Sequence, residues 1–230
     1  MSNASRTAAE AKAHRISVMV QELGQFYDAL WQQVAWLHRK WDEYVALFGT
    51  KPERISLLNE AAPSFFRVVQ DSLWEGVLLH IARLTDSPQS VGKPNLSFRR
   101  LPPLIGHKET KEQVEEDLIN AIEATGFCRD WRNRHIAHRD LNLALGLGAE
   151  PLKSASRAQV KAALEALAKI LNTIESHYLD STTFFDFGSE SGGAEALLYV
   201  IADGLGANQE RLNRLKAATA VPNDWKPRQL

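Results

Sequence analysis

The sequence has little cysteine, little net charge and no long apolar run. A single cysteine, Cys128, excludes a disulfide within the chain and fits a reducing compartment. The net charge of −1 provides no global field that would attract nucleic acid, so such attraction requires a local basic patch. The longest apolar run, residues 196–202, is far shorter than the ~18 residues of a membrane-spanning helix. We therefore expect a soluble, cytoplasmic protein with no membrane partner.

The composition is that of an ordinary globular protein. Charged residues make up 24% of the chain and aromatic residues 8%, which excludes disordered and collagen-like classes. A length of 230 residues is enough for one sizeable core or at most two small ones. We expect a single domain over residues 1–230, with frayed ends at about 1–12 and 220–230.

A long apolar stripe dominates the N-terminal fifth of the chain. Its members recur in steps of three and four, which keeps them on one face of an α-helix. An unbroken helix would be about 50 Å long, and Gly24 is the point where it can divide into two. Thr50, Lys51 and Pro52 end the stripe. The members are Ile16, Val20, Leu23, Tyr27, Leu30, Val34, Leu37, Trp41, Tyr44 and Phe48.

Similar stripes predict further helices, and no alternating pattern persists long enough to predict a sheet. One helix starts near Pro63, and Ser156 is placed to cap another. The segment 181–193 is the only one with the character of a strand or a loop. The remaining predicted helices cover residues 110–125, 127–141 and 194–217. The expected fold is therefore all-α, an antiparallel helical bundle with a long N-terminal helix or helix pair.

The stretch "WRNRHIAHRD", residues 131–140, concentrates three arginines, two histidines and an asparagine in ten residues. On an ideal helix, Arg134, His135 and His138 share a face with the bulky side chains of Phe127 and Trp131. A polar group beside large apolar side chains is partly desolvated and needs partners or a ligand. This arrangement favours a binding site over a solvated helix surface.

The stretch also resembles a known motif. "RNRHIAH", residues 132–138, resembles the Arg–polar–spacer–His motif of HEPN domains, small helical domains of prokaryotic defence and toxin–antitoxin systems. The following "AHRD" looks like the AbiU2-like branch of that superfamily, and residues 82–101 are similar to the segment that joins earlier helices in that branch. The resemblance implies a HEPN-like bundle and a metal-independent endoribonuclease without cofactors. It also implies a homodimer whose two motifs face each other, with RNA as substrate and a cognate antitoxin as a possible partner.

The resemblance assigns roles to individual residues. His138 would move a proton, either from the attacking 2′-hydroxyl or to the leaving 5′-oxygen. Arg132 would hold the phosphate and offset the charge that builds on it, while Asn133 would orient the phosphate or His138. The flanking basic residues expected to contact RNA are Arg129, Arg134, His135 and Arg139.

Several alternatives stay open at this stage. On an ideal helix Arg132 and His138 point about 120° apart, so Arg132 can serve the partner's active site instead, or Arg134 can take its role. The spacing of His135 and His138 suits a metal, but no further clustered ligand is nearby, so we expect no metal site. A non-catalytic HEPN module that binds RNA, a nucleotide or a protein partner is the main rival function. A helical scaffold with no ligand is a third possibility.

Overall fold

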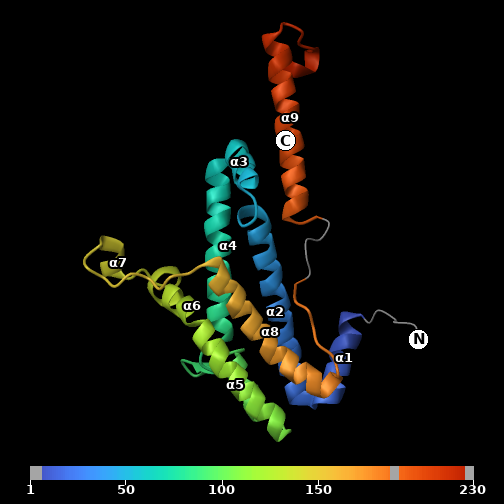
Figure 1. Ribbon diagram of the computed structural model, residues 1–230, viewed down its shortest axis with the longest axis vertical. Helices are drawn as coiled ribbons and strands as arrows, with labels where there is room; N and C mark the ends of the chain where they lie inside the picture. Colours follow the sequence, from blue (N-terminus) through green and yellow to red (C-terminus); the bar gives the residue numbers. More distant parts are fainter. Residues whose placement is uncertain (1–6, 187–191, 226–230) are drawn as a thin grey trace. The chain divides into compact units, whose positions relative to one another are not determined.

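The computed structural model describes residues 7–186 and 192–225, and almost all of its regular structure is helical (Figure 1). The α-helices span Ala8–Met19 (α1), Gln21–Phe48 (α2), Pro52–Ala61 (α3), Pro63–Leu84 (α4), Lys108–Ala124 (α5), Gly126–Trp131 (α6), Leu141–Leu145 (α7), Arg157–Leu179 (α8) and Ala194–Lys216 (α9). The shorter elements are the antiparallel pair Gln89–Ser90 (β1) and Lys93–Pro94 (β2), the 3₁₀ turns Phe98–Arg100 (η1), Pro102–Leu104 (η2) and Pro222–Trp225 (η4), and the π-helical turn Arg132–Ile136 (η3). The predicted all-α helical bundle is confirmed.

The N-terminal stripe forms two helices that break at Val20. Val20 has a φ of 68° and is 74% exposed, so it leaves the buried face that the stripe predicted for it. Gly24 was the wrong place for the break, because it lies inside α2 and has a different role. A Cβ there would come within 2.6 Å of the Ile16 Cα and 2.8 Å of the Arg15 carbonyl oxygen. The missing side chain of Gly24 lets α1 pack closely on α2.

Replacing Gly24 by alanine therefore tests the packing of α1 on α2. Both atoms that the new methyl group would meet belong to the backbone of α1, so the helix itself must shift. We expect a loss of about 1–3 kcal/mol in the free energy of unfolding, measured by urea titration. Gly76→Ala is the matched control, because a Cβ there meets nothing within 4 Å. That variant is expected to gain about 0.5–1 kcal/mol, since alanine favours a helix interior over glycine.

The other long helices follow their sequence signals. Helix α4 begins at Pro63, α5 and α9 cover the predicted segments to within two residues, and α8 follows Ser156. Ser156 accepts a hydrogen bond from the Gln159 backbone while the Gln159 side chain accepts one from the Ser156 backbone, which is a capping box. Helix α3 has no counterpart among the predicted helices, because the sequence predicts that the first stripe ends at Pro52 and that the next helix starts near Pro63.

The described chain divides into two units, and the first contains residues 7–41 and 73–186. Within it, α5 packs along α8 (Figure 1). The end of α4 is followed by the β1–β2 pair and by η1, whose Phe98 is fully buried. The buried apolar side chains of this unit include Leu23, Tyr27, Leu30, Val34, Leu37, Val77, Leu78, Ile81, Phe98, Leu101, Val114, Leu164, Leu167 and Leu171. This core supports the polar stretch, residues 131–140.

The second unit contains residues 42–72 and 192–225. Here α3 packs against α9, and Arg54 Nη2 lies 2.7 Å from Glu195 Oε1. The turn η4 is held to α9 by Asp224, whose carboxylate accepts hydrogen bonds from Arg214 at 2.7 and 3.0 Å. No described helix is long and apolar enough to cross a bilayer.

The predicted single domain and frayed ends stay predictions. Thr7 caps α1, so the described part of the first twelve residues is helical, and η4 lies within the other expected tail. Residues 1–6 and 226–230 lie outside the described residues. Of the segment expected to be strand or loop, residues 181–186 are irregular and 187–191 lie outside the described residues.

Candidate functional site

The polar stretch does not form the continuous helix over 127–141 that the sequence predicted. Helix α6 ends at Trp131 and the backbone widens into the π-helical turn η3. The Ala137 amide donates to the Arg132 carbonyl oxygen at 2.8 Å, five residues back, where an α-helix would bond four residues back. Helix α7 then starts anew, capped by the Asp140 side chain. The angles taken from an ideal helix therefore do not apply to Arg132 and His138.

Arg132 is held by two side chains. Its Nη1 donates to Asp86 Oδ2, and its Nε donates to Asn133 Oδ1 at 2.9 Å. The side chains of Arg132 and Asp86 are each 24% exposed, so the pair is partly withdrawn from water yet still reachable. Two of the three residues predicted to be catalytic, Arg132 and Asn133, are thus brought together. The partner Asp86, which follows the end of α4, was missed by sequence reasoning.

Thr85 and Asp86 together gather three arginines. Arg129 donates from Nη1 to the Thr85 hydroxyl at 3.0 Å, and Arg99 donates from Nε to the Thr85 carbonyl oxygen at 2.9 Å. Because Asp86 binds Arg132, consecutive residues anchor guanidinium groups from η1, α6 and η3. The Asp86 carboxylate balances one of the three guanidinium charges, which leaves a local excess of two positive charges. We call these five residues the arginine cluster.

Arg129 is the interior member of the arginine cluster. Its Nη2 donates to the Ile122 carbonyl oxygen at 2.6 Å, and its Nη1 also reaches the Thr125 hydroxyl at 3.3 Å. Burial, and next the positive charge of Arg99, lower the pKa of the Arg129 guanidinium. These bonds account for its terminal nitrogens within the fold, so its role here is to join α5, α6 and the end of α4. RNA contact by Arg129 stays a prediction.

Three other predicted RNA-binding residues line a separate hollow of about 400 Å³. Arg134, His135 and Arg139 lie on its wall, which is completed by Asp140, Leu143, Ala144, Pro151 and Leu152. Arg134 donates to the carbonyl oxygens of Glu150 and Pro151, so much of its bonding capacity holds the loop before α8. His135 Nε2 lies 3.3 Å from Glu75 Oε1. Arg139 is exposed.

His138 is exposed and makes no hydrogen bond or ion pair with any described residue. Within one protomer the described structure records no contact between His138 and Arg132. Arg134 lies 3.5 Å from Asp130 and 3.6 Å from Asp140, and the alternative in which it takes the role of Arg132 stays a prediction. The imidazole is therefore available to a ligand or to another chain.

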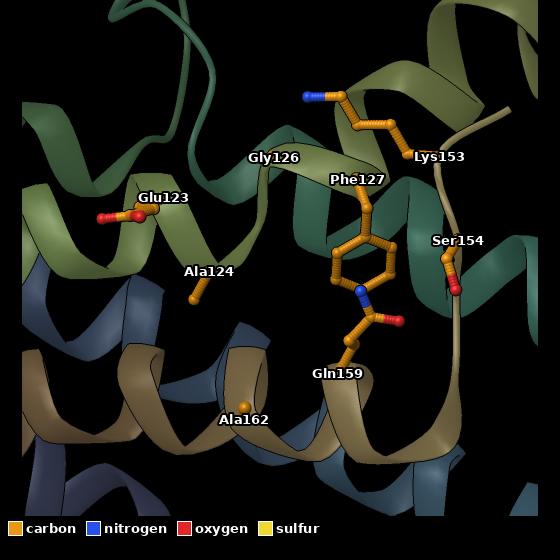
Figure 2. Close-up of a pocket in the computed structure, with 8 residues that line it drawn as sticks. All are labelled: Glu123, Ala124, Gly126, Phe127, Lys153, Ser154, Gln159 and Ala162. Atoms are coloured by element: carbon orange, nitrogen blue, oxygen red, sulfur yellow. The ribbon is translucent and has the colours of Figure 1, made fainter.

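A second hollow, of about 430 Å³, lies between the start of α6 and the first turns of α8 (Figure 2). Figure 2 shows Phe127 pointing toward Gln159, with Lys153 and Glu123 as the charged residues of the lining. None of the residues predicted to be functional is among those that line it. It is therefore separate from the candidate site.

Burial raises the pKa of the fully buried Cys128 thiol to about 12, which agrees with a packing role. Among residues 7–186 and 192–225, no group of three or more His, Cys, Asp or Glu side chains is arranged to hold a metal ion.

The family model for AbiU2, a group of HEPN domains, matches residues 20–197, well over half of the chain. The chain belongs to the AbiU2 family of HEPN domains. No curated protein and no solved structure matches it. The part matched by the AbiU2 family holds every predicted site residue and the whole arginine cluster, whereas α1 and nearly all of α9 lie outside it.

Proposed function

We propose that this AbiU2-family protein is a metal-independent endoribonuclease that acts in abortive infection or as the toxin of a toxin–antitoxin pair. The proposal rests on Arg132. Its side chain is held in a fixed orientation, is partly exposed, and lies in a cluster with excess positive charge. Asp86 and Asn133 engage its Nη1 and Nε, while neither bond uses Nη2. A guanidinium fixed on one edge can receive a phosphate oxygen without first losing much conformational freedom.

The reaction is a transesterification that requires no water. The ribose 2′-oxygen attacks the neighbouring phosphorus, and the bond from phosphorus to the 5′-oxygen breaks. The 2′-hydroxyl loses a proton and the leaving 5′-oxygen gains one, so the products are a 2′,3′-cyclic phosphate and a 5′-hydroxyl. His138 moves one of these protons, and Arg132 offsets the negative charge on the phosphate oxygens in the transition state.

A homodimer brings His138 and Arg132 close to each other. Because His138 makes no hydrogen bond or ion pair with a described residue of its own chain, a symmetric pair of chains can place one protomer's His138 beside its partner's Arg132. A two-fold interface produces two equivalent sites of this kind. The single-stranded RNA would then lie along the dimer contact, where the two positive clusters attract its backbone.

The product chemistry provides the test. Purified protein should cleave single-stranded RNA in the presence of EDTA and leave 2′,3′-cyclic phosphate and 5′-hydroxyl ends, detected by mass spectrometry. An oligonucleotide with one 2′-deoxyribose at the cleaved position should stay intact there, because the nucleophile is missing. Loss of cleavage with EDTA, or products with a 3′-hydroxyl, would remove the proposed mechanism. Binding of RNA without cleavage would favour the non-catalytic HEPN module.

A further inference from the structure

Arg99 is an exposed member of the arginine cluster that neither the motif nor the proposed reaction uses. Its position is fixed by the backbone around it. The Ser97 hydroxyl donates to the Asp86 carbonyl oxygen at 2.6 Å and accepts from the Arg99 amide at 3.3 Å. With Arg99 Nε on the Thr85 carbonyl oxygen, the turn η1 is tied at two points to the residues that follow the end of α4. Arg99 is thus presented by a rigid support.

The charge on Arg99 has no partner of opposite sign in the described part of the chain. Some other arginines of the described chain are paired with a carboxylate, as in Arg15–Asp28 and Arg214–Asp224, both at 2.7 Å. Arg99 bonds only through Nε, so its two terminal amino groups meet no acceptor among the described residues. An exposed, oriented arginine with both terminal nitrogens available is suited to bidentate binding of a phosphate.

Arg99 and Arg132 are held by consecutive residues of the chain. Thr85 holds Arg99, Asp86 holds Arg132, and the Cα atoms of adjacent residues are about 3.8 Å apart. The positive charges of both arginines also act on Arg129. Neighbouring phosphates of one nucleic-acid strand could therefore meet the two arginines in succession.

We propose that Arg99 is a second phosphate-binding site, which holds the phosphodiester next to the one that Arg132 engages on a single-stranded RNA. The inference rests on the proposed function for its ligand. It adds a subsite that binds the strand and performs no chemistry. Arg99 accordingly contributes to affinity for RNA of several nucleotides and contributes nothing to the reaction of the scissile phosphate itself.

Binding measurements test this directly. The probe is a fluorescent single-stranded RNA of about ten nucleotides with 2′-O-methyl groups, which cannot be cleaved. Arg99→Gln should weaken binding about five- to tenfold and lower the dependence of log affinity on log salt by about 0.7, the value for one phosphate contact on a single strand. Arg99→Lys keeps the charge and should retain the salt dependence. Arg67→Gln is the matched control, because Arg67 is exposed and lies in the other unit.

Cleavage measurements separate this inference from the proposed function. For the oligonucleotide, Arg99→Gln should raise KM and leave kcat unchanged. For a dinucleotide with a single phosphate, the variant should match the wild type, since there is no second phosphate to bind. If the wild type binds RNA with the expected Arg99 dependence but never cleaves it, the proposed function fails and the subsite stands. If Arg99→Gln matches the wild type in binding, or reduces dinucleotide cleavage, or if the wild type does not bind RNA, the subsite is wrong.

Discussion

Replacing His138 by alanine is expected to lower the rate of RNA cleavage by about 10²–10⁴-fold, the usual contribution of a positioned general acid or base. The fold should be unaffected, because the exposed imidazole makes no bond to a described residue. The free energy of unfolding should therefore stay within about 0.5 kcal/mol of the wild type. The matched control is His14→Ala on α1, which lies outside the residues that match the AbiU2 family. Equal activity of the His138 variant and the wild type would contradict the assigned role.

Mixing two inactive variants tests whether one site uses both chains. Arg132→Ala and His138→Ala should each have little activity as homodimers, because every site then lacks one of the two residues. If one protomer's Arg132 works with its partner's His138, each mixed dimer retains one intact site. Random exchange of subunits at equal concentration should then restore about a quarter of wild-type activity, since half of the dimers are mixed. No recovery after confirmed exchange would place both residues of a site in the same chain.

Arg132→Ala is expected to lower kcat by about 10²–10³-fold, the typical cost of losing one group that stabilises charge in the transition state. Arg132→Lys should recover only part of this loss, because an ammonium group cannot bind Asp86, Asn133 and a phosphate with one planar fork. Steady-state cleavage of a short RNA measures both effects. A lysine variant with full activity would show that any cation suffices at this position.

The ion pair with Asp86 offers a purely structural explanation for Arg132, and a double substitution separates the two roles. Removing one partner leaves the other partly buried and unpaired, whereas removing both together avoids that cost. The stability of Asp86→Asn combined with Arg132→Gln should therefore lie closer to the wild type than that of either single variant. Its cleavage activity should stay as low as that of Arg132→Gln. Recovery of activity together with stability would mean that the arginine only supports the fold.

Local signals were enough to predict most of the helices. The apolar stripe of α8 and its Ser156 cap, or the Pro63 start of α4, depend only on residues close in the chain. The break at Val20 was missed because its cause lies in the approach of α1 to Gly24. The π-helical turn was missed for a similar reason. Its arginines bond to Asp86 and to the loop before α8, and a pattern with a fixed helical period does not contain those contacts.

The sequence predicted only part of the candidate site. The residues that it missed join the site through tertiary contacts between segments that are distant in the chain. The family resemblance supplied Arg132, Asn133 and His138, since these residues are close in sequence. Asp86 and Arg99 belong to the segment 82–101, which carried the resemblance but had no functional reason assigned to it. Asp86 is 46 residues from Arg132, and only the packing of α4 against α6 and η3 brings them into one site.

The π-helical turn has a consequence for how this motif can vary. A turn that closes five residues back accommodates one residue more than an α-helical turn closing four residues back. Deleting one residue between Arg132 and Ala137 could let the backbone return to α-helical winding, with the arginine still beside Asp86 and the chain still leading to α7. The π-helical turn can therefore lose a single residue while the pairing of Arg132 with Asp86 is preserved.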